Sequence, residues 1–221
     1  MLITFDDGYR DNYDIALPIL KKHDAAAIFF ITTEVVTEND CLLHDKIRYL
    51  TQNKCIPLSY NELPTMMYKG IRNYNDDDID FINSSFEKHK PLKRMMLNAT
   101  EIERIKKDGF KIGNHTHKHI ALSFYSQTEQ QYNIQKANEI LHSIIGEYPV
   151  HFAYPNGLSN EDTIKSLKVL KFKYAYTING GFNNQSISKF KLMRIGVNAS
   201  DSISFIILKL ILYATVKKGK I

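Results

Sequence analysis

The sequence has no tryptophan, only two cysteines, and no apolar run of the ~20 residues that a membrane-spanning helix needs. Cys41 and Cys55 stand apart, without the paired framework of a disulfide-stabilised secreted domain or the closely spaced doublets of a zinc site. The residues after Met1 show no charged leader, apolar core or cleavage site, so we expect no conventional signal peptide. We therefore expect a cytoplasmic protein.

A concentrated basic surface is also missing. The 29 Lys and Arg against 24 Asp and Glu give a formal charge of +5, but the cations occur as scattered pairs such as Lys21-Lys22 and Lys106-Lys107. Nucleic-acid binding usually needs them gathered on one face, so we expect no nucleic-acid partner. The 221 residues, 43% of them apolar, fit one domain over residues 1–221 with a substantial core.

Short apolar runs alternate with helical patterns along most of the chain. This spacing is typical of parallel α/β units with right-handed crossovers, and several such units favour a barrel-like (β/α) fold over an open sheet. Strands are expected over Met1–Phe5, Ala25–Thr32, Phe110–Gly113, His151–Tyr154 and Tyr174–Ile178, and helices over Asp11–His23, Ala99–Asp108, Gln127–Ile145 and Glu161–Leu170.

Local signals predict helix starts and core-facing positions. Asp11 is the expected N-cap of the first helix, and Thr100 with Glu103 makes a capping-box pattern in the second. The apolar positions expected to face the core are Ile15, Leu17, Ile19 and Leu20 in the first helix, and Tyr132, Ile134, Ala137, Ile140, Leu141, Ile144 and Ile145 in the long one.

Two segments depart from the alternation. Residues 40–98 predict a mainly helical insertion, with helices over Asp45–Leu50 and Asp78–Lys88, overhanging the active-site end of the barrel. Residues 202–221 predict an apolar helix with a basic tail. We expect this helix to pack on the barrel; the alternative is peripheral contact of residues 203–220 with the inner face of a membrane.

The strongest chemical signal joins two distant motifs. Asp6 and Asp7 end the first expected strand, and the cluster His115-Thr116-His117-Lys118-His119 follows the third. An unpaired buried charge is costly, and a divalent metal shared with histidines would remove that cost. We therefore expect a metal-dependent hydrolase, in which one aspartate completes the metal site and the other takes a proton from the attacking water.

The choice of histidines depends on local geometry. His115 and His119, four residues apart, face the same way on a helical turn, whereas on a strand His117 would share their face. Gly113-Asn114 just before them favours a turn. We therefore favour His115 and His119 as the pair, with His117 on the surface or beside the ligands.

These motifs resemble the polysaccharide deacetylase, or NodB-homology, family of carbohydrate esterases. The resemblance rests on Thr4–Gly8 with His115-Thr116-x-x-His119, and extends through Ala25–Phe30, Asp108–Thr116 and Phe152–Gly157. The last segment resembles the third motif of poly-N-acetylglucosamine deacetylases and of members from capsule or lipopolysaccharide gene clusters.

The resemblance implies a distorted (β/α) barrel with a bound divalent metal, commonly zinc, that hydrolyses N-acetyl groups of amino sugars in cell-surface polysaccharide biosynthesis. The substrate would be an N-acetylated sugar or glycan, and the expected location favours a nucleotide sugar or lipid-linked intermediate. The roles implied are Asp6 as general base, Asp7, His115 and His119 as metal ligands, Asn156 as backbone oxyanion donor, and Tyr154 and Pro155 as substrate contacts.

The chain departs from the family pattern at several positions. Ala153 stands where an arginine often braces the base, and Asn156 stands at a tyrosine position. The segment Leu192–Ile195 lacks the fifth-motif histidine, a usual general acid, and the common fourth-motif tryptophan is absent. The general acid is thus unassigned, with His44 and His151 as candidates.

Two other functions compete with this interpretation. A phosphatase of the haloacid-dehalogenase type needs Asp-x-Asp spacing, which Asp6-Asp7 lacks, and it leaves the histidine cluster unexplained. A glycan-binding domain without turnover would explain the missing arginine and acid. It would not explain a base placed beside a complete set of metal ligands.

Overall fold

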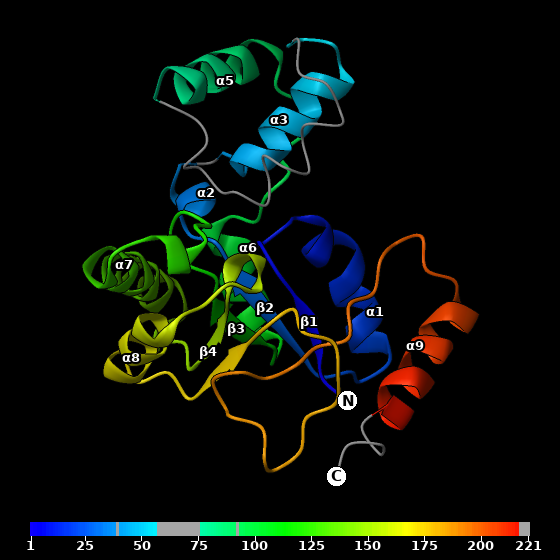
Figure 1. The fold of residues 1–221 in the computed structure, drawn as a ribbon. Helices are drawn as coiled ribbons and strands as arrows, with labels where there is room; N and C mark the ends of the chain where they lie inside the picture. Colours follow the sequence, from blue (N-terminus) through cyan, green and yellow to red (C-terminus); the bar gives the residue numbers. More distant parts are fainter. Residues whose placement is uncertain (39, 57–75, 92, 217–221) are drawn as a thin grey trace.

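The computed structural model describes residues 1–38, 40–56, 76–91 and 93–216 of the chain. Five short parallel strands lie side by side in sequence order, and the sheet curls into a half-barrel of the NodB type (Figure 1). The strands are β1 (Ile3–Phe5), β2 (Ala27–Ile31), β3 (Lys111–Asn114), β4 (His151–Ala153) and β5 (Tyr174–Tyr176), each within or one residue beyond an expected strand.

Strand β2 is buried along its whole length, between β1 and β3. Its alternate side chains point to opposite faces, as strand geometry requires. Phe29 and Ile31 pack in the main core beneath the helices, while Ile28 and Phe30 join Tyr176 in a smaller cluster on the other face. Burial on both faces explains why β2 reads as an uninterrupted apolar run.

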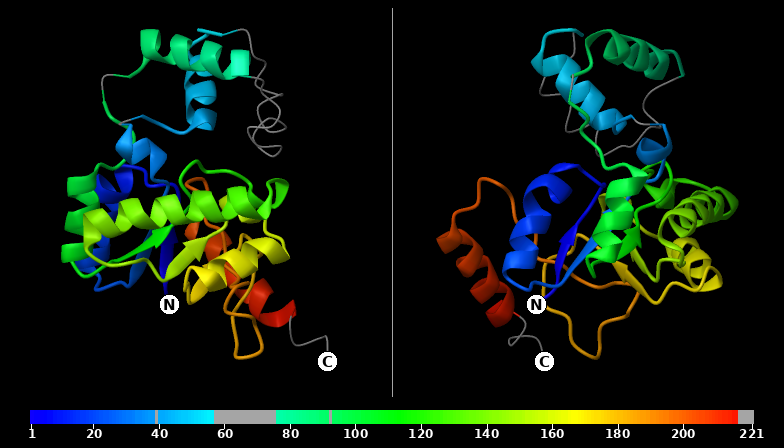
Figure 2. Two further views of the ribbon diagram at one scale, coloured as in Figure 1. Left: turned by 90° about the vertical axis from the view of Figure 1, so that its left-hand side faces the viewer. Right: turned by 180° about the vertical axis from the view of Figure 1, so that it is seen from behind.

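Helices follow the strands and cover the outer face of the sheet (Figures 1 and 2). The longer helices match the expected ranges closely, which confirms the βα alternation. The longer helices are η1 (Asn12–Ala16) running into α1 (Leu17–Lys22), then α6 (Ala99–Lys107), α7 (Gln127–Ile145) and α8 (Glu161–Val169). Three short helical turns lie between them: α2 (Glu34–Thr37), η3 (Leu122–Phe124) and η4 (Pro155–Gly157).

Three residues expected in the core are instead exposed: Ile15, Ile19 and Tyr132 are each more than half accessible to solvent. The first helix opens with the wider π-helical turn η1, so a regular 3.6-residue pattern does not hold along it. Leu17 and Leu20 are the side chains of that helix that are buried.

One predicted helix start is wrong and another is confirmed. Helix α6 is capped by Asn98 with Glu101 in a reciprocal capping box, rather than by Thr100 with Glu103. Asp11 is the N-cap residue of the first helix, as expected, although its backbone is helical and its side chain makes no capping hydrogen bond. In α6 the amide side chain of Asn98 simply starts the same motif two residues earlier.

The insertion forms a separate lobe at one end of the molecule (Figure 2). It contains α3 (Leu43–Gln52) and α5 (Asp76–His89), which include both expected helices; residues 57–75 lie outside the described chain. The lobe meets the barrel through a bridge between Tyr9 and Met96. Its own core consists of Val35, Cys41, Leu42, Ile47, Leu50, Ile56, Ile82, Phe86 and Met96.

The chain after β5 runs without a further strand in the described residues, apart from a bridge between Leu192 and Tyr176. It ends in helix α9 (Ile203–Val216), drawn in red at the margin of Figure 1. Among the helices of the described part of the chain, none combines the length and apolarity that a membrane crossing needs.

We expect Gly113→Ala to destabilise the fold by about 1–3 kcal/mol through overpacking. A Cβ at Gly113 would lie 2.3 Å from the ring of Phe30, and that ring is fully buried. Gly196→Ala is the matched control because nothing lies within 4 Å of its added Cβ. Urea unfolding of both variants measures the difference, and equal midpoints would contradict this packing.

Candidate metal centre

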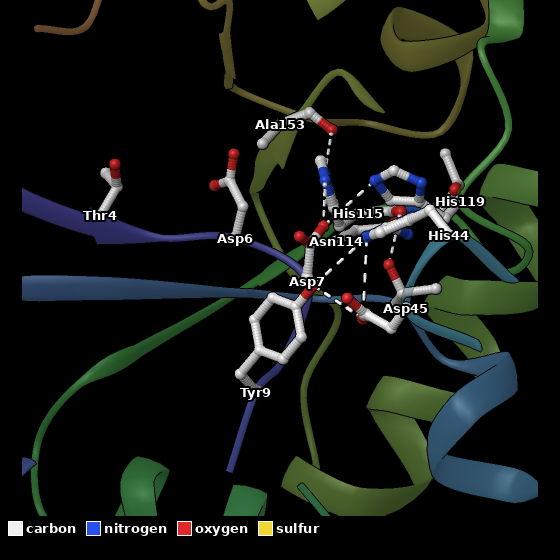
Figure 3. Close-up of polar contacts among 12 residues, drawn as sticks. Thr4, Asp6, Asp7, Tyr9, His44, Asp45, Asn114, His115, His119 and Ala153 are labelled. Carbon is white, nitrogen blue, oxygen red and sulfur yellow. Dashed lines mark hydrogen bonds and ion pairs between the residues drawn. The ribbon is translucent and has the colours of Figure 1, made fainter. Parts of the chain in front are cut away.

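The predicted site residues gather at the carboxyl edge of the half-barrel. Asp6 and Asp7 follow β1, and His115 follows β3, so parallel strands deliver them to the same edge. The chain turns sharply after β1, where Asp7 has φ 72° and Gly8 has φ 90°. After this left-handed turn the two adjacent carboxylates have different partners, since Asp6 pairs with Arg194 whereas Asp7 faces His115 (Figure 3).

Asp7, His115 and His119 converge on one point (Figure 3). Oδ1 of Asp7 lies 3.2 Å from Nε2 of His115 and 3.1 Å from Nε2 of His119. One potential ligand atom from each residue lies within 4.8 Å of the others. The structure thus brings together the three residues that the sequence singled out as a metal-binding set.

The segment that carries the two histidines is an irregular turn, not the expected helical turn. Thr116 and His119 have positive φ angles of 67° and 51°, which fold the chain back so that both rings face Asp7. His117 is buried, contrary to a surface location, and its Nδ1 lies 2.9 Å from the hydroxyl of Thr33. Burial lowers the pKa of His117 to about 4.

The electrostatics of the cluster favour a charged Asp7. Burial alone would raise the pKa of this carboxyl, but His115 and His119 hold it well below its usual range. Burial would likewise lower the pKa of His115, whereas the carboxylates of Asp7 and Asp6 raise it. The three groups form a coupled set centred on one buried oxygen.

That oxygen is the observation that tests whether a metal fits. Oδ1 of Asp7 is buried and has no aligned hydrogen-bond donor among the described residues, although two imidazole nitrogens face it. A buried polar atom without a partner costs free energy. One carboxylate with two imidazoles is a donor set that suits zinc, so the residues present fit a divalent metal.

The first histidine is held by its second nitrogen. Nδ1 of His115 lies 2.8 Å from the carbonyl oxygen of Ala153, which makes Nδ1 the donor and turns Nε2 toward Asp7. Asn114 stabilises the turn that follows, since its Oδ1 accepts from the backbone N–H of Thr116 at 2.7 Å and its amide donates to Asn138 at 2.9 Å. The ligand is therefore oriented before any metal binds.

Asp6 makes a bidentate ion pair with Arg194, at 2.7 and 2.8 Å. Arg194 also donates to the hydroxyl of Thr4 and to the carbonyl of Thr177. In the family pattern a bracing arginine is expected at the position that Ala153 occupies in this chain. An arginine from the segment after β5 makes that contact, and no local pattern indicated it because 188 positions separate the partners.

The third motif has a mixed outcome. Asn156 lies in η4 with φ 55°, directly after β4 and near Ala153. Tyr154, expected to contact substrate, is fully buried in the core, and its hydroxyl donates to the carbonyl of Phe190 at 2.8 Å. Pro155 is also buried. Both residues are therefore buried, and their expected contact with substrate stays a prediction.

Of the two candidate acids, only His44 lies at the cluster. Its ring is 5.4 Å from the ring of His119, and its Nε2 is 3.3 Å from the hydroxyl of Tyr9. That hydroxyl donates to Asp45 at 2.8 Å, so a short polar chain runs from the insertion to the metal-binding set. Burial lowers the pKa of His44.

His151 lies at the opposite end of the half-barrel. It begins β4, pairs with Tyr174 at the start of β5, and its Nδ1 is 3.1 Å from the hydroxyl of Tyr176. Burial lowers its pKa to about 4. Parallel strands place their starts away from the carboxyl edge, so His151 is a core histidine.

We expect His119→Gln to weaken Zn²⁺ binding on the order of 100-fold, because it removes one of three converging ligands. His117→Gln is the matched control, since that ring faces Thr33 instead of Asp7. Metal content after dialysis and calorimetric titration with Zn²⁺ measure both variants. Equal loss of metal in the two variants would contradict the assignment of ligands.

Comparison with known proteins agrees with this geometry. Residues 1–175 match the model of the family described as polysaccharide deacetylase. A Bacillus subtilis (strain 168) protein named as a polysaccharide deacetylase, YxkH, is 20% identical over 198 residues, which cover 90% of this chain. The chain spans about half of that relative, 51% of its length.

Solved structures share the fold. The deacetylase PplD of Streptococcus pyogenes, solved in complex with acetate, superposes with a TM-score of 0.64 at 20% identity, covering 93% of this chain and 68% of its own. IcaB from Ammonifex degensii gives a TM-score of 0.61 at 17% identity, covering 95% and 71%. At these identities the structures establish the fold alone.

The family match includes β1 with its two aspartates, the histidine turn after β3 and the segment after β4. It therefore spans every element that contributes to the Asp7, His115 and His119 cluster. From this match over most of its length, the chain belongs to the polysaccharide deacetylase, or NodB-homology, family.

Proposed function

We propose that this protein is a metal-dependent hydrolase that removes N-acetyl groups from an amino-sugar-containing glycan or glycan precursor. The observation that carries the proposal is the cluster of Asp7, His115 and His119 with a second, separately held carboxylate, Asp6, beside it. Family membership supports the reaction class. Cell-surface polysaccharide biosynthesis is the process to which we assign it.

Asp7, His115 and His119 would hold the metal, most simply zinc. When bound, the ion would supply Lewis acidity toward the acetyl carbonyl and toward the attacking water. Two features of the protein favour metal binding: the carbonyl of Ala153 orients His115, and the lowered pKa of Asp7 keeps its carboxylate charged. Three protein ligands leave room for substrate, as catalytic rather than structural sites require.

Asp6 is the proposed general base. Both of its oxygens are fixed by Arg194, so the carboxylate is held in one orientation next to Asp7. It would take a proton from the water that attacks the acetyl carbon. Arg194 is a positioning residue in this scheme, and it takes the part that the family usually gives to a third-motif arginine.

Two further groups complete the scheme. The backbone N–H of Asn156, in the turn after β4, is the proposed donor to the oxyanion. Breaking the C–N bond leaves an amine that must receive a proton. His44 is the imidazole near the cluster that could provide it, since it enters from the insertion beside His119.

We expect Asp6→Asn to lower the rate of acetate release by about 10²–10⁴-fold while metal content stays unchanged. Arg194→Gln should lower it by about 10²-fold, because the base remains but loses its orientation. The assay compares free N-acetylated oligosaccharides with lipid-linked N-acetylated sugars. Unchanged acetate release by Asp6→Asn would refute the assigned base, and a metal-loaded wild type without turnover would favour a glycan-binding role.

We expect His44→Gln to reduce acetate release by about 10²-fold and His151→Gln to leave it near the wild-type rate. The two variants delete the same ring at opposite ends of the half-barrel, so each controls for the other. Thermal unfolding of both proteins corrects for lost stability. A larger loss in His151→Gln at equal folded fraction would contradict the placement of the acid half of the site.

A further inference from the structure

Helix α9 presents an uncovered apolar surface. Seven of its large hydrophobic side chains are exposed, and besides Tyr213 they are six apolar ones that range from 47% for Phe205 to 78% for Ile203. Soluble monomers rarely leave such a continuous patch in water unless it binds something. The six side chains, which we call the outward face, are Ile203, Phe205, Ile207, Leu208, Ile211 and Leu212.

Helical geometry shows that these residues form one surface. At about 100° per residue they fall within an arc of roughly 200°. The other exposed side chains described in that arc are Ser204, Ala214 and Thr215, so it carries no charge. The outward face is therefore apolar over about half of the helix circumference.

The remaining arc fastens α9 to the protein. Lys209 donates to Asp201 at 2.7 Å and to the carbonyl of Gly196 at 3.1 Å. The ring of Tyr213 lies against Gly180, where an added Cβ would be only 2.1 Å from its hydroxyl. Lys209 thus ties α9 to the segment that precedes it, and Tyr213 contacts the loop after β5, both from the side of the helix away from the outward face.

Several partners could cover an apolar helix, and the charge of this segment favours lipid. A helix that lies in a membrane surface buries its apolar face at the acyl boundary and is held there by Lys and Arg that meet anionic headgroups. From Ser202 to Ile221 the sequence has four lysines and no acidic residue. Lys209 is paired, which leaves three lysines after the helix to meet anionic headgroups.

We propose that α9 docks the protein on an anionic membrane surface, with the outward face among the acyl chains and the helix axis in the membrane plane. Over its described residues the helix is too short to cross the bilayer. Apolar immersion and a basic tail are the two signals that lasting peripheral attachment requires. The cytoplasmic leaflet of a membrane is such an anionic surface.

The position of α9 suits this role. It lies at the margin of the molecule, and the insertion projects from the opposite end in every view (Figures 1 and 2). The helix also lies outside residues 1–175, the part that matches the family. The inference therefore stands independently of the proposed deacetylation.

The absence of tryptophan offers a direct test. Phe205→Trp places the single indole of the chain on the outward face, and Tyr132→Trp places it on α7 at a similarly exposed position. With vesicles of phosphatidylcholine and phosphatidylglycerol, we expect a blue shift of emission for the first variant and none for the second. Equal shifts, or none for either, would overturn the proposal.

Flotation of the full chain with the same vesicles gives the second readout. The double variant Ile207→Glu and Ile211→Glu should lower the partition coefficient onto the vesicles at least about 100-fold, because transferring charged residues into acyl chains is unfavourable. Val169→Glu, an exposed apolar position on α8, should bind like the wild type. For vesicles of phosphatidylcholine alone, the partition coefficient of the wild type should be roughly 100-fold lower, because three lysines lose their anionic headgroups.

The outcomes separate lipid from protein partners. A wild type that ignores vesicles but forms a dimer sensitive to Ile207→Glu would show that a second copy covers the outward face, and would refute the membrane. Acetate release from a soluble oligosaccharide should be the same for these variants and the wild type. Loss of that activity alone would bear on the proposed function and not on membrane docking.

Discussion

The ion pair between Asp6 and Arg194 links the two edges of the sheet. Strands β1 and β5 are the outermost of the five, and no described strand joins them. Arg194 comes from the chain after β5 and binds Asp6 and Thr4 at β1, with its guanidinium 5.8 Å from the ring centre of Phe30. A bidentate, partly buried pair of this kind is directional, and breaking one side of it leaves a charge without a partner. The same contact that closes the half-barrel therefore fixes the proposed base.

The metal-binding set depends on residues whose backbone has positive φ angles. Seven non-glycine residues in the described chain have positive φ, and four of them, Asp7, Thr116, His119 and Asn156, lie at this site. Each such residue costs free energy that the surrounding fold must offset. Here the offset comes from neighbouring contacts, such as the hydrogen bond from Thr116 to the side chain of Asn114. The positive φ angles of Asp7 and His119 accompany side chains that face each other, with Oδ1 of Asp7 3.1 Å from Nε2 of His119.

The sequence predicted those parts of the fold that local patterns determine. The strands and the long helix α7 follow from apolar runs and a regular period, and the spacing of His115 and His119 selected the two histidines that the structure brings to Asp7. The expected helical turn does not form, however, and an irregular turn with positive φ at Thr116 and His119 brings the two rings together. Ile15 failed for a similar reason, since a π-helical turn breaks the period on which its burial was predicted.

What the sequence did not predict depends on contacts between distant segments. Arg194 stands in a stretch without a motif for a bracing cation, and only closure of the half-barrel brings it to Asp6. Choosing His44 over His151 likewise needed the position of the insertion. Tyr154 was predicted to contact substrate because it lies within the third motif. The alternation of a strand directs its ring into the core.

The insertion has its own hydrophobic core, distinct from those that flank the sheet. The proposed metal ligands come from the barrel, whereas His44 and Asp45 come from the insertion. The surroundings of the proposed site are thus assembled from two hydrophobic clusters, which meet at Val36. Substitutions inside the core of the lobe would change the position of His44 and Asp45 while the strands that present Asp7 and the histidines keep their own packing.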